Sequence, residues 1–345
     1  MVQLGIIGSG YMALTYAEAI ARHVRGARLA AIAGGKRAAQ LAAEYGVTPE
    51  PNVEALLARR DIDGIILTTP DYLHCEQTLL AATAGKHILV EKPMAPTIAQ
   101  CDRMIQACRA AGVSLAVVKT ERYRRVTKLA KKLIEEDRIG RLMLLATISS
   151  FPSSVGKEIY RSRPWHSHPE SGGLFLNMAS HNADMLIWLT MLKPVRVFAQ
   201  AHTFSDLPEP AQSVMATVAF EGGVMAQMWI CAEMPAPGLP SSEVRFQVVG
   251  SEGLLDFENY EFLRLGSGDH WETLLTPERF DYVRDPKSPV RLEPHIGVVQ
   301  EFVDSIVDHR APAVGGRDGR AAVEICQACL LSARSGQAVA LPFGE

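Results

Sequence analysis

The feature that most constrains the fold is a glycine-rich turn near the start of the chain. Residues 2–7 are mostly apolar β-formers, Gly8-Ser9-Gly10-Tyr11-Met12-Ala13 follows, and residues 14–23 have a helical apolar pattern. This is G-x-G-x-x-A between a strand and a helix. The first glycine permits the tight turn, the second lets backbone amides approach a pyrophosphate, and Ala13 keeps the helix close to the sheet. The stretch predicts dinucleotide binding by Gly8, Ser9, Gly10, Tyr11 and Met12; a glycine turn that binds nothing is the alternative.

Strands and helices continue to alternate after this turn. Further strands are expected at 27–33, 64–68, 88–90 and 113–118, separated by helices at 38–45, 53–59, 71–84 and 98–111. Repeated units of this length predict an α/β fold with a parallel, doubly wound sheet. Ligands bind at the carboxyl edge of such sheets, so the strand ends at Gly8, Thr69 and Glu91 should meet at one crevice.

The end of the second strand bears on the choice of cofactor. An NAD enzyme usually has an acidic residue there for the ribose 2′-hydroxyl, but this chain has Gly34 and Gly35, followed by Lys36 and Arg37. Without the carboxylate, nothing at this position repels a 2′-phosphate, and the two cations can hold one. The sequence favours NADP, with NAD possible. The alternative is that both cations are merely solvated.

A lysine follows the short strand at 88–90, in the sequence Glu91-Lys92-Pro93. Lysine rarely lies beside a buried strand end, because its ammonium must keep a partner or lose its proton. The alternative is a side chain that extends to water.

These segments together resemble the Gfo/Idh/MocA family of NAD(P)-dependent oxidoreductases. The match lies in residues 5–13, in Thr69-Pro70 with His74, and in residues 85–93, and it continues in segments through to residue 342. The resemblance implies a Rossmann domain at 1–122 and an α+β domain at 123–345 that binds substrate and oligomerises, with a C-terminal helix packing back. It adds Thr69, Pro70, His74, Glu91 and Lys92 to the expected cofactor contacts.

The resemblance also assigns catalytic roles to Lys92 and His181. An ammonium beside the nicotinamide can donate a hydrogen bond to the substrate oxygen. A helix expected from about residue 173 to Leu192 places Asn177, His181 and Asp184 on one face. His181 matches the family's catalytic histidine, and imidazole is a suitable acid and base because its unperturbed pKa lies near neutral pH. The alternative is a histidine packed in the core. The family usually has aspartate where Asn177 lies, so Lys92 and His181 must share the proton transfer while Asn177 and Asp184 bind substrate.

The segment 151–170 combines aromatic and polar residues and is expected to be an irregular wall over the substrate, with Tyr160, Arg163 and Trp165 as contacts. Its two histidines, His166 and His168, have no third ligand at supporting spacing, so no metal is expected.

The second half of the chain predicts a largely antiparallel sheet, with segments at 195–201, 214–220, 224–231, 244–249 and 253–258 separated by short turns. Segments 214–220 and 225–230 are apolar on both faces. One face should lie on helices and the other on a second subunit, in a homodimer or homotetramer; a sheet covered within its own chain is the alternative. Residues 266–294 are expected to be a mobile loop.

Composition excludes several function classes. A net charge of −3 gives no electrostatic case for nucleic acid or an anionic membrane. The chain starts without a signal-peptide pattern and has no apolar run long enough to span a bilayer, so a cytoplasmic location is expected. The six cysteines are dispersed, and Cys326 and Cys329 lie in a helical apolar pattern, which indicates packing thiols.

The sequence therefore predicts an NADP-preferring oxidoreductase that interconverts a secondary alcohol and a ketone of a small-molecule sugar, polyol or sugar derivative. One alternative is a dehydrogenase of a cyclic dihydrodiol or hemiacetal of an aromatic acid, whose carboxylate Arg161 and Arg163 could bind. Another, from a different class, is an NADP-binding sensor or scaffold without turnover. Asn177 favours that class, whereas Lys92 and His181 argue against it.

Overall fold

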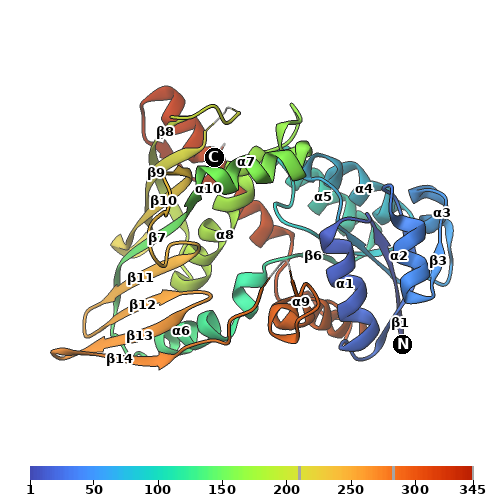
Figure 1. Cartoon of the computed structure of the whole chain (residues 1–345), viewed down its shortest axis with the longest axis horizontal. Helices are drawn as coiled ribbons and strands as arrows, with labels where there is room; N and C mark the ends of the chain where they lie inside the picture. The colour runs from blue at the N-terminus through green and yellow to red at the C-terminus, as the bar shows by residue number, and fades with distance from the viewer. Residues whose placement is uncertain (209–210, 282–283, 344–345) are drawn as a thin grey trace. The chain divides into compact units, whose positions relative to one another are not determined.

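The computed structural model describes residues 1–208, 211–281 and 284–343, and the chain divides into two compact units. The first contains Met1–Tyr123 and Phe280–Arg320, and the second contains Arg124–Arg279 and Ala321–Glu345. The first holds a six-stranded sheet and the second a nine-stranded sheet (Figure 1). The predicted fold class, a parallel Rossmann sheet and a largely antiparallel second sheet, is confirmed. The boundaries 1–122 and 123–345 stay a prediction, and the structure groups residues 280–320 with the first unit.

The first sheet has the strand order β3-β2-β1-β4-β5-β6, and all its pairs are parallel. Its strands are β1 Val2–Ile7, β2 Ala27–Ala33, β3 Thr48–Pro49, β4 Gly64–Leu67, β5 His87–Val90 and β6 Leu115–Val117. The helices of this unit are α1 Tyr11–Arg22, α2 Ala38–Tyr45, α3 Val53–Ala58, α4 Asp71–Thr83, α5 Ile98–Ala111 and α9 Pro289–Val307, with the 3-10 turn η1 Thr120–Tyr123.

Both faces of this sheet are buried. Leu4 and Ile6 of β1 pack in one cluster with α1 and with Phe302 of α9. On the other face, a Cβ at Gly5 would lie 2.9 Å from the side chain of Leu56 in α3. Burial on both faces explains why the parallel strands are continuous apolar runs rather than alternating ones.

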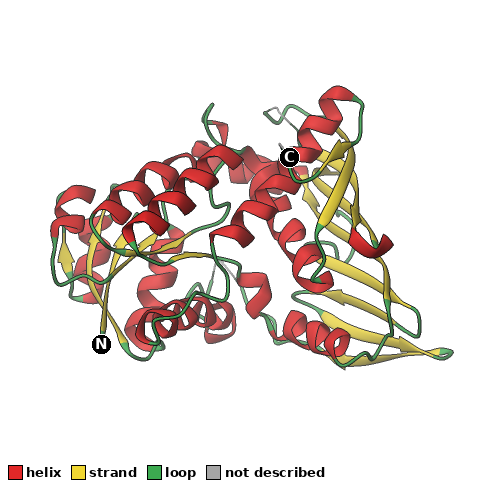
Figure 2. Cartoon of the chain, turned by 180° about the vertical axis from the view of Figure 1, so that it is seen from behind, coloured by secondary structure: helices red, strands yellow, loops and turns green. Residues whose placement is uncertain are grey.

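The second sheet has the order β14-β13-β12-β11-β7-β10-β9-β8-β15, and its only parallel pair among the described strands is β7 with β10. Its strands are β7 Leu142–Pro152, β8 Pro194–His202, β9 Ser213–Phe220, β10 Met225–Met234, β11 Arg245–Gly250, β12 Leu254–Glu258, β13 Phe262–Ser267, β14 His270–Leu275 and β15 Val339–Ala340. The remaining elements are α6 Arg125–Glu135, α7 Ser153–Ser162, η2 Pro164–Ser167, α8 Gly173–Thr190, η3 Glu221–Gly223 and α10 Gly316–Ser335. The unit boundary falls within α10. Figure 2 shows the helices of the chain in red and its strands in yellow.

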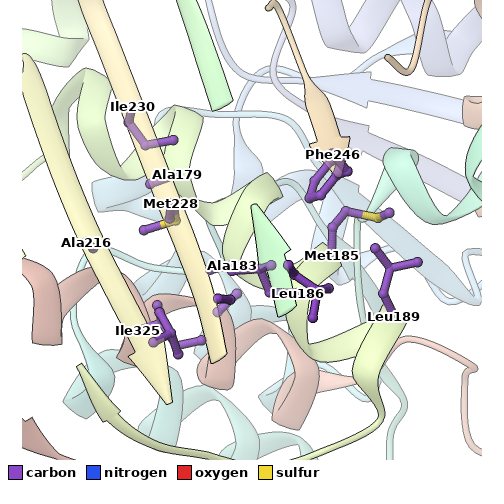
Figure 3. Close-up of a cluster of buried hydrophobic side chains, with 14 of the residues drawn as sticks. Ala179, Ala183, Met185, Leu186, Leu189, Ala216, Met228, Ile230, Phe246 and Ile325 are labelled. Atoms are coloured by element: carbon purple, nitrogen blue, oxygen red, sulfur yellow. The ribbon is translucent and has the colours of Figure 1, made fainter. Parts of the chain in front are cut away.

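Helix α8 forms the centre of the second core. Its Ala179, Ala183 and Leu186 pack in one cluster with Met228 of β10 and Ile325 of α10 (Figure 3). Small alanine side chains let the helix lie close to the sheet, so that the larger residues around it fill the space at native density. The helix is thereby held along its length against the sheet.

Two loop predictions are wrong. The segment 151–170 contains α7 and η2 rather than an irregular wall. Its Ser and Pro residues suggested a loop, but α7 packs on β7 and β10, and a Cβ at Gly156 would lie 2.7 Å from the carbonyl oxygen of Ala232. Tertiary contact therefore overrides the weak helix propensity of these residues.

The second wrong prediction is the mobile loop at 266–294. This range contains β14, which pairs with β13 across a turn at Gly268, and the first residues of α9. The strand faces water over most of its residues, so its sequence lacks the apolar alternation that would have marked it. Residues 282 and 283 of the predicted loop lie outside the described residues.

The six cysteines are all buried and form no disulfide with one another, as expected for packing thiols. No helix in the described part of the chain combines the length and apolar character needed to cross a bilayer.

Candidate active site

The glycine turn after β1 has the geometry that a dinucleotide requires. Gly8 has φ +117°, and a Cβ there would lie 2.3 Å from Oγ1 of Thr68, so only glycine fits without displacement. Gly10 is the N-cap residue of α1, and nothing lies within 4 Å of the position its Cβ would take. The backbone of Gly10 therefore lies open next to the first backbone amides of α1, the groups that would bind a pyrophosphate.

The turn after β2 lies against Ser9. Gly34 and Gly35 have φ +78° and +79°, and a Cβ at Gly35 would lie 2.4 Å from the Ser9 hydroxyl oxygen. That oxygen accepts a hydrogen bond from the backbone N–H of Arg37 at 3.1 Å. Lys36 and Arg37 are exposed immediately before α2. The turn thus presents two cations and no carboxylate.

The predicted strand ends do meet at one edge of the sheet. The backbone N–H of Gly8 donates to the carbonyl of Ala33 at 2.8 Å, and that of Thr68 donates to Ile7 at 2.9 Å. The N–H of Glu91 donates to Leu67 at 3.0 Å. Gly8, Thr69 and Glu91 consequently line the carboxyl edge of three adjacent strands.

Glu91 anchors the turn that carries Lys92. One carboxylate oxygen of Glu91 accepts a hydrogen bond from the backbone N–H of Lys92 at 2.9 Å, and the other accepts from the hydroxyl of Tyr16 at 2.5 Å. Tyr16 is fully buried in α1, and burial together with the Glu91 carboxylate holds the pKa of this phenol well above its usual value. Lys92 itself is half-buried, and the Lys92–Pro93 peptide bond is cis. Sequence reasoning missed Tyr16, whose only signal is its place on the apolar face of α1.

His74 lies in the first turn of α4 and is 1% exposed. Its Nε2 is 2.9 Å from the carbonyl oxygen of Thr69, and its Nδ1 is 3.0 Å from that of Pro93. The hydroxyl of Thr69 donates to Gln77 at 2.5 Å, and Pro70 is the N-cap residue of α4. The ring nitrogens of His74 therefore face backbone carbonyls, and its predicted cofactor contact stays a prediction.

Arg291 of α9 is a second residue that sequence reasoning missed. Its guanidinium carbon lies 4.4 Å from the ring centroid of Tyr11, and its Nη2 donates to the hydroxyl of Thr15 at 2.7 Å. Arg291 is 2% exposed. It supports the first turns of α1 from a segment almost 280 residues away along the chain, and no local pattern marks such a contact.

The other group of candidate residues belongs to the second unit, on α8. Asn177 and His181 are half-buried and Asp184 is buried, at the i, i+4 and i+7 spacing that puts them on one helical face. Asn182, which was not predicted, donates to the hydroxyl of Thr147 at 2.6 Å and accepts from that of Ser149 at 3.0 Å. Because both partners lie in β7, these bonds fix the rotation of α8 about its axis.

Two of the three predicted residues at 160–165 lie around His166, which is 3% exposed. The ring of Trp165 lies 3.7 Å from that of His166, and the ring of Tyr160 lies 6.1 Å from it. The hydroxyl of Tyr160 accepts a hydrogen bond from Gln212 at 2.8 Å, and burial raises the pKa of this phenol. Arg163 is exposed between α7 and η2. Within the described ranges, no three His, Cys, Asp or Glu side chains are grouped to hold a metal ion.

Comparisons with known proteins agree with this architecture. Residues 2–119 match the model of an oxidoreductase family with an NAD-binding Rossmann fold, and residues 127–256 match the GFO/IDH/MocA C-terminal domain. The 1,5-anhydro-D-fructose reductase of Ensifer adhaerens is 29% identical over 352 residues, covering 100% of both chains. The inositol 2-dehydrogenase of Rhizobium meliloti is 26% identical and covers 96% of both. The crystal structure of the WlbA dehydrogenase from Bordetella pertussis, in complex with NADH and UDP-GlcNAcA, has a TM-score of 0.82 at 26% identity and 99% coverage of both chains.

Proposed function

Because the chain belongs to the Gfo/Idh/MocA family of oxidoreductases, we propose that it transfers a hydride between a nicotinamide cofactor and a sugar, polyol or sugar derivative, at a secondary alcohol or ketone. The observation that carries the proposal is the anchored Lys92 turn, at the same sheet edge as the open glycine turn. Two relatives, a 1,5-anhydro-D-fructose reductase and an inositol 2-dehydrogenase, support this substrate class.

In the proposed reaction, Lys92 and His181 act on the substrate oxygen. The nicotinamide, when bound, accepts or supplies the hydride. The Lys92 ammonium donates a hydrogen bond to the oxygen and stabilises its alkoxide character. His181 accepts the hydroxyl proton during oxidation and returns it during reduction. Asn177 orients the substrate, because an amide can donate and accept hydrogen bonds but cannot become an anion.

A screen for thermal stabilisation by cofactors and substrates, followed by turnover assays, tests this function. The panel contains NAD(H), NADP(H), neutral sugars and polyols, and carboxylated cyclic diols. A change in nicotinamide absorbance with sugars or polyols is expected. Turnover of only the carboxylated diols would instead favour the aromatic-acid alternative. Stabilisation by cofactor without any absorbance change would favour a sensor.

We further propose that NADP is preferred over NAD. The turn at residues 34–37 offers Lys36 and Arg37 and no carboxylate, and Ser9 fixes its backbone through Arg37. The 2′-phosphate of NADP can accept charge-assisted hydrogen bonds from these two cations. The neutral 2′-hydroxyl of NAD can form only weaker hydrogen bonds with them.

Replacing both cations by alanine, in K36A/R37A, is expected to weaken NADP binding by at least about 100-fold, since two charge-assisted bonds of about 1.5 kcal/mol or more each are lost. NAD binding should change little. Fluorescence titration with the reduced forms measures both affinities. The control R103A/R109A removes two exposed cations from α5. Equal losses for NADP and NAD would contradict the assignment.

We also propose a homo-oligomer formed through the nine-stranded sheet. Leu144, Met225, Leu254 and Trp271, called here the apolar row, are 43%, 56%, 37% and 53% exposed. Strand pairing makes the row continuous. Met225 lies opposite Leu144, and Leu144 and Leu254 both lie opposite Val249. Leu254 and Trp271 both lie opposite Gly266. A cavity of about 270 Å³ lies beside Leu254 and Trp271. An exposed apolar surface of this kind marks an interface, and a second copy can cover it symmetrically.

The variant L144E/M225E is expected to convert the oligomer to a monomer, because it would bury two unpaired carboxylates at the centre of the interface. Sedimentation velocity measures the change. The control L80E adds a carboxylate at a residue of α4 that is 46% exposed. A wild-type protein that is already monomeric would contradict the proposal.

A further inference from the structure

The imidazole of His74 connects the ends of two adjacent parallel strands. Thr69, whose carbonyl lies 2.9 Å from Nε2, follows β4, and Pro93, whose carbonyl lies 3.0 Å from Nδ1, follows β5. The two strands pair along their length, with Leu67 opposite Val90. Beyond the hydrogen bond from the Glu91 N–H to the Leu67 carbonyl the ladder ends, and the ring of His74 lies between the segments that follow the two strands.

The contact between His74 and Pro93 involves the residue after Lys92, whereas Glu91 is the residue before it. The carboxylate of Glu91 holds the Lys92 N–H at 2.9 Å, and Glu91 in turn is held by the carbonyl of Leu67 and the hydroxyl of Tyr16. His74 holds the carbonyl of the next residue, Pro93. The backbone of Lys92 is thus fixed on both sides by groups from α1, β4 and α4.

Few side chains can do what His74 does here. A neutral imidazole donates from one nitrogen and holds one of the two carbonyls, and the protonated ring holds both. The ring is also rigid and 1% exposed, so it fills its site without rotamer freedom. Phenylalanine would fill the space without a donor, and glutamine would keep donors on a flexible side chain.

We propose that His74 is a positioning residue for Lys92: its ring lies between the carbonyls of Thr69 and Pro93, and the N–H that it donates there helps to set the place from which the ammonium meets the substrate oxygen. The kinetic part of this proposal rests on the proposed function. A misplacement of about 1 Å in such a group can lower the rate by about 100-fold without any loss of binding groups.

The variant H74F is therefore expected to lower kcat by about 10- to 100-fold while the KM for cofactor stays within about threefold. H74Q should recover part of the loss. The matched control is H87F, at the opposite end of β5, where the ring accepts a hydrogen bond from the backbone N–H of Ser114 at 3.1 Å. H87F removes one imidazole hydrogen bond from the same strand and should leave kcat near the wild-type value. Equal effects of H74F and H87F would overturn the proposal.

A second measurement does not need turnover. The rate at which acetic anhydride modifies the Lys92 amine, followed by mass spectrometry of the peptides after digestion, reports how firmly the turn holds this side chain. We expect this rate to change severalfold in H74F, by less in H74Q and not in H87F. An unchanged rate in H74F would overturn the proposal even if kcat fell. If wild type shows no turnover with any substrate, the proposed function fails, whereas the acetylation rates still decide the role of His74.

Discussion

Replacing Lys92 with methionine is expected to lower kcat/KM by about 1,000-fold, or about 4 kcal/mol of transition-state stabilisation. Methionine keeps much of the apolar stem and removes the ammonium, so the hydrogen bond to the developing alkoxide is lost while the turn keeps its backbone contacts through Glu91. Steady-state kinetics measures the loss. Cofactor affinity and Tm should change far less than kcat/KM, because the proposed role of the ammonium is to act on the substrate oxygen.

Lys86 provides the control for this prediction. It lies six residues earlier, just before β5, is 6% exposed, and donates to the carbonyls of Arg59 and Ile62 at 2.6 and 2.8 Å. K86M should lower the free energy of unfolding by about 1 to 3 kcal/mol, because two buried acceptors lose their donor, and should leave kcat intact. A K92M variant that keeps full turnover, or one that loses stability as K86M does, would contradict a catalytic role for Lys92.

Replacing His181 with glutamine is expected to lower kcat/KM by about 100-fold, within the range for loss of a general acid–base group. Glutamine can still hydrogen-bond to the substrate, so KM should change less than kcat. The proposed role also predicts that the limb of the pH–rate profile that depends on this group disappears in H181Q. Asn177, one turn earlier on α8, cannot replace it, because an amide is neither an acid nor a base near neutral pH.

The same substitution at His202 is the control for H181Q. His202 ends β8, is exposed, and lies in the same unit. H202Q should leave kcat and the pH profile unchanged. Retention of the wild-type profile in H181Q would leave Lys92 alone with the proton transfer and would remove His181 from the mechanism.

The sequence was sufficient where local geometry decides the structure. Gly8 is predicted to permit a tight turn at the sheet edge, and its φ of +117° explains that requirement. Gly34 and Gly35 stand out in the sequence only for the carboxylate that they lack, and their φ values of +78° and +79° show that this turn also favours glycine. The helix α8 was predicted with its polar face, since helical spacing alone places Asn177, His181 and Asp184 together.

The sequence was insufficient where contacts between distant residues decide the structure. Helix α7 forms because it packs on the second sheet, although its Ser and Gly residues favour a loop. The bonds of Tyr16 to Glu91 and of Arg291 to Thr15 join residues 75 and 276 positions apart. No periodic pattern records such pairs, and an alignment of relatives would be needed to find them as covarying positions.

The place of α9 in the first unit has a consequence for how the chain folds during synthesis. Val299, Phe302 and Val303 of α9 complete the core cluster that contains Leu4 and Ile6 of β1. The ribosome must therefore make about 300 residues before this face of the first sheet is covered. Until then this apolar face of the sheet stays exposed in the nascent chain, while the ribosome synthesises most of the second unit. Contacts of such long sequence separation slow folding, and the interval leaves time for a chaperone to bind.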